Sequence, residues 1–544
     1  MKKFTGKGAY GAIAVGRISV FKHQDIRIKR ECVEDIAAEL VRLEEAKQVA
    51  LSQLEGIYQK ALREVGEASA RIFETHMMMI ADKNYNDSVR KIIEDQRVNA
   101  EYAVAVTADD LAERFDAMED AYMRARVADV RDVSNRIISC LGVAEQPQRD
   151  VMEEMIICAN DLAPGEIVSL DKEKVQALVM VHGSSDSHTV ILARNMGIPV
   201  IIGLDGKFLE EIRDGDIAIV NGFTGEFIVR PDEDAFTDAL RKRAEEQEKK
   251  ELLQTLKGKE DITLDGTRIN ICANIDSVDN ISAVLQNDAS GIGLFRSEFV
   301  YLERTDYPTE EEQFLVYKHV LESMGDKKVI IRTLDIGVDK KVSYFDLKEE
   351  ENPAMGLRAI RLCLTRPEIF KTQLRALYRA SVYGKLGIMF PMIVSVNELK
   401  DILSMCEVVR TELKETGIPY SKEIELGIMI ETPAAAIISD RLAPMVDFFS
   451  VGTNDLIQYT LACDRQNPAM ESFCDVHHEA VFRLIELAAK NAHENGAWIS
   501  ICGELAADIT LTEDFLRMGI DELSVSPTFV LMMRNVVRNI DLRK

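Results

Sequence analysis

The sequence lacks several features that define other classes of protein. No run of 18 or more apolar residues occurs in its 544 residues, so we expect no membrane insertion. The nine cysteines include no CxxC pair and their number is odd, which argues against a disulfide framework or a structural zinc site. These absences predict a reduced, cytoplasmic protein.

Positive charge is also scarce. Lys and Arg number 66 against 92 Asp and Glu, and the formal net charge is -26 at pH 7. Nucleic-acid phosphates repel such an acidic chain, so we expect no nucleic-acid partner. The overall charge still allows a local basic pocket for a small anion.

The first part of the chain combines one strand with a long helical region. Residues 9–21 form a glycine-punctuated apolar run, which predicts a strand. Apolar residues then recur at helical spacing, with almost no glycine or proline, over 33–62, 67–82, 84–95, 97–118 and 120–140. This pattern predicts an all-helical unit of bundle type.

A compact α/β unit is predicted over roughly 150–230. Short β-branched runs separated by turn glycines occur at 155–157, 177–180, 198–202, 217–220 and 226–229. Because 9–21 is also a predicted strand, the helical region is an insertion into this unit. The charged stretch 231–258 then predicts a connector helix.

The remaining chain alternates apolar runs with helical stretches. The eight runs are 269–275, 291–295, 328–334, 385–393, 425–430, 446–452, 498–503 and 522–526. Continuous apolar runs are typical of strands covered on both faces, and eight such units predict a (β/α)8 TIM barrel. The predicted division is therefore an α/β domain at 1–22 and 142–230, a helical domain at 23–141, a connector at 231–260 and a barrel at 261–544.

A histidine follows a polar loop at the start of a predicted helix. Asp186 or Ser187 can cap this helix, His188 lies in its first turn, and Gly197 can end it. The unpaired N–H groups there favour an anion, so His188 is a candidate to carry a phosphoryl group. On this loop alone, a surface histidine beside a helix cap is the more natural interpretation.

Polar residues follow the predicted barrel strands, where a barrel places its chemistry. They are Asn274, Arg296, Glu298, Arg332, Asp335, Glu431, Asn454, Asp455, Cys502 and Glu504, with Arg358, Arg361 and Arg465 in later loops. Several arginines at one barrel mouth repel one another unless an anion lies between them. The arginines and Lys340 therefore suggest a ligand carrying phosphate and carboxylate.

Two further features of this mouth suggest its chemistry. Glu431 and Asp455 close adjacent strands, and such hard carboxylates suit Mg²⁺ better than zinc. Cys502 follows a strand, where its thiol can exchange a proton with a substrate carbon. Together these residues predict metal-assisted phosphoryl chemistry on a small organic phosphate.

Long stretches of the chain resemble one known family. They are SHTVILARNMGIPVIIG (187–203), GIGLFRSEFVYL (291–302), PTEEEQF (308–314), IIRTLDIGVDK (330–340), ENPAMGLRAIRL (351–362), GIMIETPAAA (427–436), DFFSVGTNDLIQYTLACDR (447–465) and ICGELAAD (501–508). In this order they resemble enzyme I of the bacterial phosphoenolpyruvate:sugar phosphotransferase system. That family consists of phosphoenolpyruvate–protein phosphotransferases.

The resemblance implies a role for each site residue. His188 accepts the phosphoryl group on Nε2, and Cys502 protonates the enolate to give pyruvate. Glu431 and Asp455 hold Mg²⁺. Phosphoenolpyruvate is bound by Arg296, Arg332, Asn454 and Arg465, to which the strand-end pattern adds Asp455, Arg358 and Lys340.

The resemblance also implies how the domains work. The α/β domain is a swivelling phosphohistidine domain, and the helical insertion docks the phosphocarrier HPr, whose histidine is phosphorylated next. The barrel binds phosphoenolpyruvate and forms a homodimer. This is the first step of sugar transport by the phosphotransferase system.

The sequence departs from the family pattern near the histidine, and other functions are conceivable. Ser184, Ser185 and Asp186 replace a more basic segment, and Ile167 stands where a threonine is usual. One alternative is a non-catalytic regulator that senses phosphoenolpyruvate. Another is an enzyme like pyruvate–phosphate dikinase or phosphoenolpyruvate synthase without the nucleotide domain, although no glycine-rich ATP-binding segment is present.

Overall fold

The computed structural model describes residues 1–21, 28–64, 67–116, 121–143, 154–172, 174–183, 187–302, 304, 306–337, 342–348, 350–464 and 467–544. The chain divides into two compact units, Met1–Lys249 and Lys250–Lys544. This division falls within the predicted connector. Each unit has its own apolar core.

The first unit contains an eight-stranded sheet in the order β1-β8-β7-β3-β4-β5-β6-β2. Its strands are β1 (Lys2–Thr5), β2 (Lys7–Tyr10), β3 (Ile13–Phe21), β4 (Met155–Ala159), β5 (Val175–Met180), β6 (Val200–Ile202), β7 (Ile217–Asn221) and β8 (Glu226–Val229). The strands β3 to β6 run parallel, and β7, β8, β1 and β2 pair antiparallel. Because β3 pairs with β4, the helices between them in sequence are an insertion into this sheet.

The inserted helices form a bundle close to the one predicted. They are α1 (Ile36–Glu64), α2 (Glu67–Ala81), α3 (Lys83–Gln96), α4 (Ala100–Asp116) and α5 (Ala121–Ile138). Their apolar stripes meet in a core that includes Leu54, Phe73 and Val104. Helical spacing located them well because each buries one face only.

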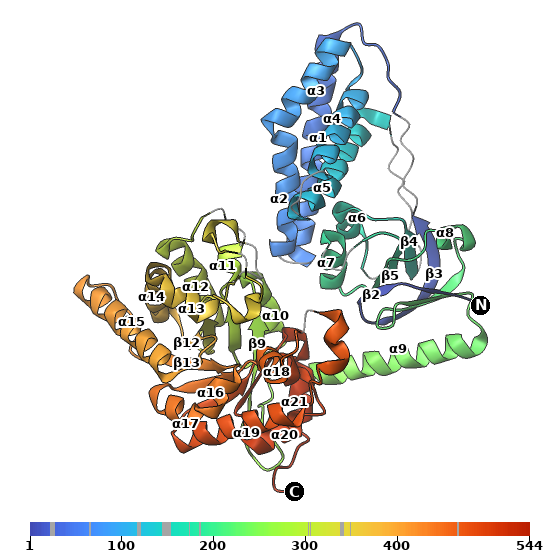
Figure 1. The fold of residues 1–544 in the computed structure, drawn as a ribbon. Coiled ribbons are helices and arrows are strands. Elements are labelled where there is room, and N and C mark those ends of the chain that lie inside the picture. Colours follow the sequence, from blue (N-terminus) through green and yellow to red (C-terminus); the bar gives the residue numbers. More distant parts are fainter. Residues whose placement is uncertain are drawn as a thin grey trace. The chain divides into compact units, whose positions relative to one another are not determined.

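The bundle shares its core with two short helices of the α/β part. The helices α6 (Pro164–Ser169) and α7 (His188–Asn195) lie between the bundle and the sheet (Figure 1). Val190 and Leu192 of α7 belong to the same buried cluster as the bundle residue Phe73. This packing holds the start of α7, where His188 lies, beside the helical insertion. The opposite face of the sheet is covered by α8 (Phe208–Glu211).

The predicted connector is the helix α9 (Glu233–Gln254). Its first turns pack on the sheet, where Ala239 is buried against Val15 and Ile219. Most of its other side chains are exposed, which agrees with the charged sequence. The chain after α9 is fixed in the second unit, because Arg534 donates a hydrogen bond to the carbonyl of Leu256 at 3.1 Å.

The second unit is a closed barrel of eight parallel strands, as the sequence predicts. They are β9 (Asn270–Ile275), β10 (Ile292–Arg296), β11 (Val329–Arg332), β12 (Leu386–Phe390), β13 (Glu425–Ile430), β14 (Phe448–Val451), β15 (Trp498–Ile501) and β16 (Glu522–Val525). Each lies within or at the edge of one predicted apolar run. Burial on both faces made the runs continuous and therefore recognisable.

Helices surround this barrel (Figure 1). They are α10 (Ile281–Gln286), α11 (Phe299–Leu302), α12 (Glu310–Met324), α13 (Ala359–Thr365), α14 (Pro367–Ala380), α15 (Val396–Glu415), α16 (Pro433–Ile437), α17 (Ser439–Leu442), α18 (Thr453–Leu461), α19 (Glu479–Glu494), α20 (Thr512–Met518) and α21 (Val530–Val537). In the described part of the chain, none combines the length and apolar character that a bilayer span demands.

The prediction of one strand over 9–21 is wrong. The chain forms β2 and β3 instead, which pair with different strands. The break falls at Gly11, where an added Cβ would lie 2.4 Å from the ring of Phe223. The close approach of this ring depends on tertiary structure, so apolar patterning could not locate the break.

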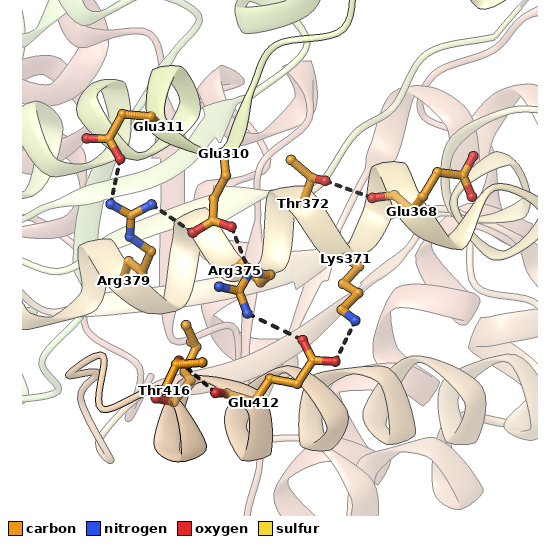
Figure 2. A network of polar contacts seen from close by, with 10 residues as sticks. Glu310, Glu311, Glu368, Lys371, Thr372, Arg375, Arg379, Glu412 and Thr416 are labelled. Atoms are coloured by element: carbon orange, nitrogen blue, oxygen red, sulfur yellow. Dashed lines mark hydrogen bonds and ion pairs between the residues drawn. The ribbon is translucent and has the colours of Figure 1, made fainter.

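An ion-pair network joins three barrel helices (Figure 2). Arg375 of α14 contacts Glu310 of α12 at 2.7 Å and Glu412 of α15 at 3.3 Å. Arg379 contacts Glu310 at 2.7 Å, and Lys371 contacts Glu412 at 2.5 Å. Because the arginines are only one-fifth exposed, these pairs are less screened by water than ordinary surface pairs.

We predict that Arg375→Met destabilises the barrel by about 1 kcal/mol, because one residue links all three helices. The fluorescence of Trp498, the only tryptophan, reports barrel unfolding in urea. The matched control is Lys490→Met, which breaks a pair 3.8 Å long whose side chains are 68% and 61% exposed. Equal midpoint shifts for the two variants would contradict a structural role for the network.

Candidate active site

A pocket of about 810 Å³ opens at the carboxyl ends of the barrel strands. Its lining includes the predicted residues Arg296, Glu298, Arg332, Asp335, Arg358, Glu431, Asn454, Asp455, Cys502 and Glu504. The predicted Asn274 and Arg361 do not line it, because their side chains bond backbone carbonyls instead. The lining residues are widely separated in sequence. The closed parallel barrel brings them together because all its strands end on the same side.

Arg332 ends β11 and is 7% exposed. Its guanidinium lies 2.5 Å from a carboxylate oxygen of Glu298 and 3.0 Å from one of Asp335. Burial alone would lower the pKa of Arg332, because it disfavours the charged form. The negative charges of Glu298 and Asp335 outweigh this effect and raise the pKa. A permanent positive charge is therefore fixed in the pocket wall.

A second buried arginine shares one of these carboxylates. The guanidinium of Arg358 lies 2.9 Å from Asp335 and 3.8 Å from Asp455. The next residue, Ala359, has a φ of 53° and donates its N–H to the carbonyl of Ile336 at 3.0 Å. Such a conformation is strained for a residue with a Cβ, and surrounding contacts must hold it. The backbone conformation at this point therefore places Arg358 against Asp335.

Glu431 follows β13 and is fully buried. One carboxyl oxygen accepts the N–H of Met392, a residue at φ 60°, while Oε2 has no hydrogen-bond partner among the residues that the structure describes. Burial first, then Asp455 and Asp335, raise the pKa of Glu431 to about 8. A group with this pKa is mostly protonated at pH 7, and a cation beside it would favour the carboxylate.

Asp455 and Asn454 lie in the first turn of α18, directly after β14. The amide of Asn454 donates to Glu504 at 2.9 Å, and its oxygen accepts the N–H of Glu504 at 3.0 Å. This reciprocal pair orients Asn454. Gly452 lets the turn pass close to Glu431, because an added Cβ would lie 2.9 Å from Oε2.

Cys502 follows β15 and is 3% exposed. Its thiol contacts the carbonyl of Val451 at 3.6 Å and hydrogen-bonds Ser450. Burial raises the pKa of Cys502 to about 11, although Ser450 and Arg332 act to lower it. The group is therefore a thiol at neutral pH and has a proton to give, as expected of a general acid.

His188 begins α7 in the first unit, as predicted. Ser187 is the N-cap residue, and its hydroxyl accepts the N–H of Val190 at 3.4 Å. The neighbouring Thr189 is buried and donates to the carbonyl of Leu162 at 2.7 Å, which anchors the helix start. The exposed imidazole of His188 thus stands at a rigid helix terminus that favours an anion.

The electrostatic surroundings keep His188 neutral. Partial desolvation lowers its pKa, Asp129 acts in the opposite direction, and Arg126 and His76 of the bundle lower it further. A lowered pKa leaves a neutral imidazole at pH 7, the form with a free lone pair. His76 is buried in the bundle, with its Nε2 3.2 Å from Asp129.

Not every predicted residue can be placed, and some lining residues were missed. Lys340, Arg465 and the alternative cap Asp186 lie outside the described residues. The lining also includes Glu351 to Met355, and the hydroxyl of Tyr459 donates to the carbonyl of Ala354. The segment ENPAMG was among the resembling stretches, which was the only indication of its place at the site.

The fold and the pocket agree with comparisons that define a class of protein. Residues 250–542 match the family model described as "PEP-utilising enzyme, PEP-binding domain". Residues 5–126 match "PEP-utilising enzyme, N-terminal", and residues 151–225 match "PEP-utilising enzyme, mobile domain". The class is therefore that of phosphoenolpyruvate-utilising enzymes.

Curated relatives narrow the class to one family. A phosphoenolpyruvate-protein phosphotransferase from Priestia megaterium is 39% identical, covering 99% of this chain and 94% of the relative. One from Geobacillus stearothermophilus is 40% identical, covering 98% and 92%. A solution structure titled Enzyme I is 32% identical and covers 45% of this chain and 99% of its own, with a TM-score of 0.40. The chain belongs to the phosphoenolpyruvate-protein phosphotransferase family.

The raised pKa of Cys502 leads to a prediction about its reactivity. At pH 8, iodoacetamide should alkylate Cys502 at least about 100-fold more slowly in the folded protein than in the urea-unfolded chain. The folded-state rate should keep rising as the pH increases from 9 to 11, because the thiolate forms only there. Peptide mass analysis measures this, with the exposed Cys32 as the internal reference. Equal rates in the folded and unfolded chain at pH 8 would contradict the assignment.

Proposed function

We propose that this protein transfers the phosphoryl group of phosphoenolpyruvate to its own His188 and then to a histidine of HPr, releasing pyruvate. The convergence of arginines, carboxylates and one protonated thiol in a single pocket carries the proposal. The family membership supports it, because the relatives bear the name of this activity.

The pocket residues suit the binding of phosphoenolpyruvate. Arg296 is exposed in the pocket and can reach an anionic group, while Arg332 and Arg358 supply fixed charge from the wall. Guanidinium groups match both phosphate and carboxylate in geometry. Asn454 adds an oriented amide, and we assign Arg465 and Lys340 to the same ligand from the sequence.

The site also suits Mg²⁺. Among the described residues, no donor hydrogen-bonds the buried Oε2 of Glu431, and Asp455 raises the pKa of this carboxyl group from nearby. Among the described residues no cluster of three or more potential ligands occurs. Two carboxylates are enough for Mg²⁺, which takes its other ligands from substrate phosphate and water. The bound ion would neutralise charge on the phosphoryl oxygens.

The reaction assigns one task to each reactive side chain. The neutral Nε2 of His188 attacks phosphorus in line with the departing enolate oxygen, and the P–O bond breaks. Arg296 and Arg332 stabilise the negative charge on the enolate and the phosphoryl group. The thiol of Cys502 gives its proton to the methylene carbon, which yields pyruvate and leaves a thiolate to be reprotonated.

The two units divide these tasks. His188 belongs to the first unit and the pocket to the second, so transfer requires His188 to reach the pocket and later the carrier. We assign the swivel to the connector at 231–260 and HPr docking to the helical segment 23–141, which shares a core with α7. A barrel homodimer and a cytoplasmic location remain predictions from the sequence.

The test is to incubate the full chain with phosphoenolpyruvate, Mg²⁺ and HPr and to follow pyruvate and phosphorylated HPr. We expect both products in equal amounts. Labelling of the protein without pyruvate release, or no pyruvate from a folded protein, would contradict the proposal. The second result would favour a regulator that only senses phosphoenolpyruvate.

The acceptor is tested separately with His188→Ala. This variant should lose all phosphorylation of itself and of HPr, because Nε2 is the only proposed acceptor. It should bind phosphoenolpyruvate with unchanged affinity by calorimetry, because the substrate residues lie in the barrel. The matched control is His493→Ala, which removes an exposed histidine paired with Asp521 and should leave phosphorylation intact. A phosphorylated His188→Ala protein would refute the assignment.

A further inference from the structure

Two cysteines outside the proposed chemistry lie close together beside the pocket. Cys463 follows α18, lines the pocket and is 4% exposed, while Cys474 is half-buried. The thiol of Cys463 donates to the carbonyl of Phe473 at 3.5 Å, and that of Cys474 contacts the carbonyl of Cys463 at 4.0 Å. The side chain of Cys463 also lies close enough to Cys474 to raise the pKa of its thiol.

This reciprocal arrangement brings the two sulfur atoms within reach of a bond. The thiol of Cys463 contacts the residue before Cys474, and the thiol of Cys474 contacts Cys463 itself. The two ends of the segment 463–474 therefore lie together. A disulfide needs its Cβ atoms only about 4 Å apart, which neighbouring thiols satisfy with small rotations. Other free cysteines in the described chain, such as Cys363 and Cys406, are buried in the barrel core.

We propose that Cys463 and Cys474 form an oxidative modification site, a dithiol that hydroperoxides convert to a disulfide at the edge of the pocket. Cys474 reacts first because it is the more exposed of the two. Cys463 then resolves the intermediate from its buried position.

The chemistry balances with a hydroperoxide as the only co-reactant. The sulfur of Cys474 attacks one oxygen of hydrogen peroxide, the O–O bond breaks, and a sulfenic acid and one water form. The sulfur of Cys463 then attacks the sulfenic sulfur, the S–O bond breaks, and a second water leaves with the thiol proton. Two thiols are oxidised and one peroxide is reduced to two waters.

The surroundings predict how this reaction depends on pH. Burial first, and then the neighbouring Cys463, raise the pKa of Cys474. A raised thiol pKa leaves little thiolate at neutral pH, so oxidation is slow there and accelerates as the pH rises. The pair is thus suited to respond to sustained exposure to peroxide.

The disulfide would also weaken the binding of phosphoenolpyruvate. It closes a ring that contains Asp464, which lines the pocket, and residue 465, the arginine assigned to phosphoenolpyruvate. Fixing this segment at both ends limits its adjustment to the substrate, so we expect KM for phosphoenolpyruvate to rise several-fold. This consequence rests on the proposed function, whereas formation of the disulfide does not.

The test treats the full chain with hydrogen peroxide at pH 7 and pH 9, blocks free thiols and maps the peptides by mass spectrometry. We expect a linked 463–474 peptide lighter by two hydrogens, faster formation at pH 9, and reversal by dithiothreitol. Cys474→Ser should lose the link. The matched control Cys32→Ser, which removes an exposed cysteine, should retain it.

Each outcome is decisive. Links of Cys463 or Cys474 to other cysteines, or oxidation of both to sulfinic acids without a link, would overturn the proposal. A linked protein with an unchanged KM for phosphoenolpyruvate would refute the effect on substrate binding. Peroxide-treated Cys474→Ser is the control, because any change in its KM comes from oxidation of Cys502 rather than from the link. If untreated protein makes no pyruvate yet the link forms, the proposed function fails while the dithiol stands.

Discussion

The arrangement of the active site depends on one buried guanidinium. Arg332 is held between Glu298 and Asp335 at the end of β11, and Asp335 is held in turn by Arg358. Removing one member of such a buried set leaves an uncompensated charge, which is costly in a protein interior. The three segments that carry these residues are therefore fixed relative to one another. The pocket keeps its shape and charge before any substrate arrives.

Burial keeps both groups beside Arg332 protonated near neutral pH, but to different degrees. Glu431 holds a proton near neutral pH because it is buried near Asp455 and Asp335. Cys502 also remains protonated because it is buried, although Arg332 moves its pKa the other way. In the proposed reaction, a cation at Glu431 and Asp455 would release the first proton, and the thiol would keep the second until the enolate forms. The carboxyl group of Glu431, with a pKa of about 8, therefore loses its proton more readily than the thiol of Cys502, with a pKa of about 11.

Much of the fold and site followed from the sequence, for identifiable physical reasons. The eight barrel strands were recognised because burial on both faces makes each of them a continuous apolar run. His188 was located because helix caps depend on local residue types, and Ser187 does cap α7. The break at Gly11 was missed because it reflects contact with Phe223, far away in sequence. Tyr459 on α18 and Glu351 in a loop were missed because their approach to the pocket depends on tertiary packing.

The most direct test of this account is the equilibrium affinity of Arg332→Lys for phosphoenolpyruvate in the presence of Mg²⁺. Lysine keeps the positive charge but lacks the planar fork that contacts two carboxylates and, in the proposed complex, the anionic substrate as well. The account predicts that affinity falls by about 100-fold, consistent with the loss of about 2–3 kcal/mol from charged hydrogen bonds. Circular dichroism would verify that the variant remains folded. Unchanged affinity in a folded variant would contradict the claim that this guanidinium organises the site.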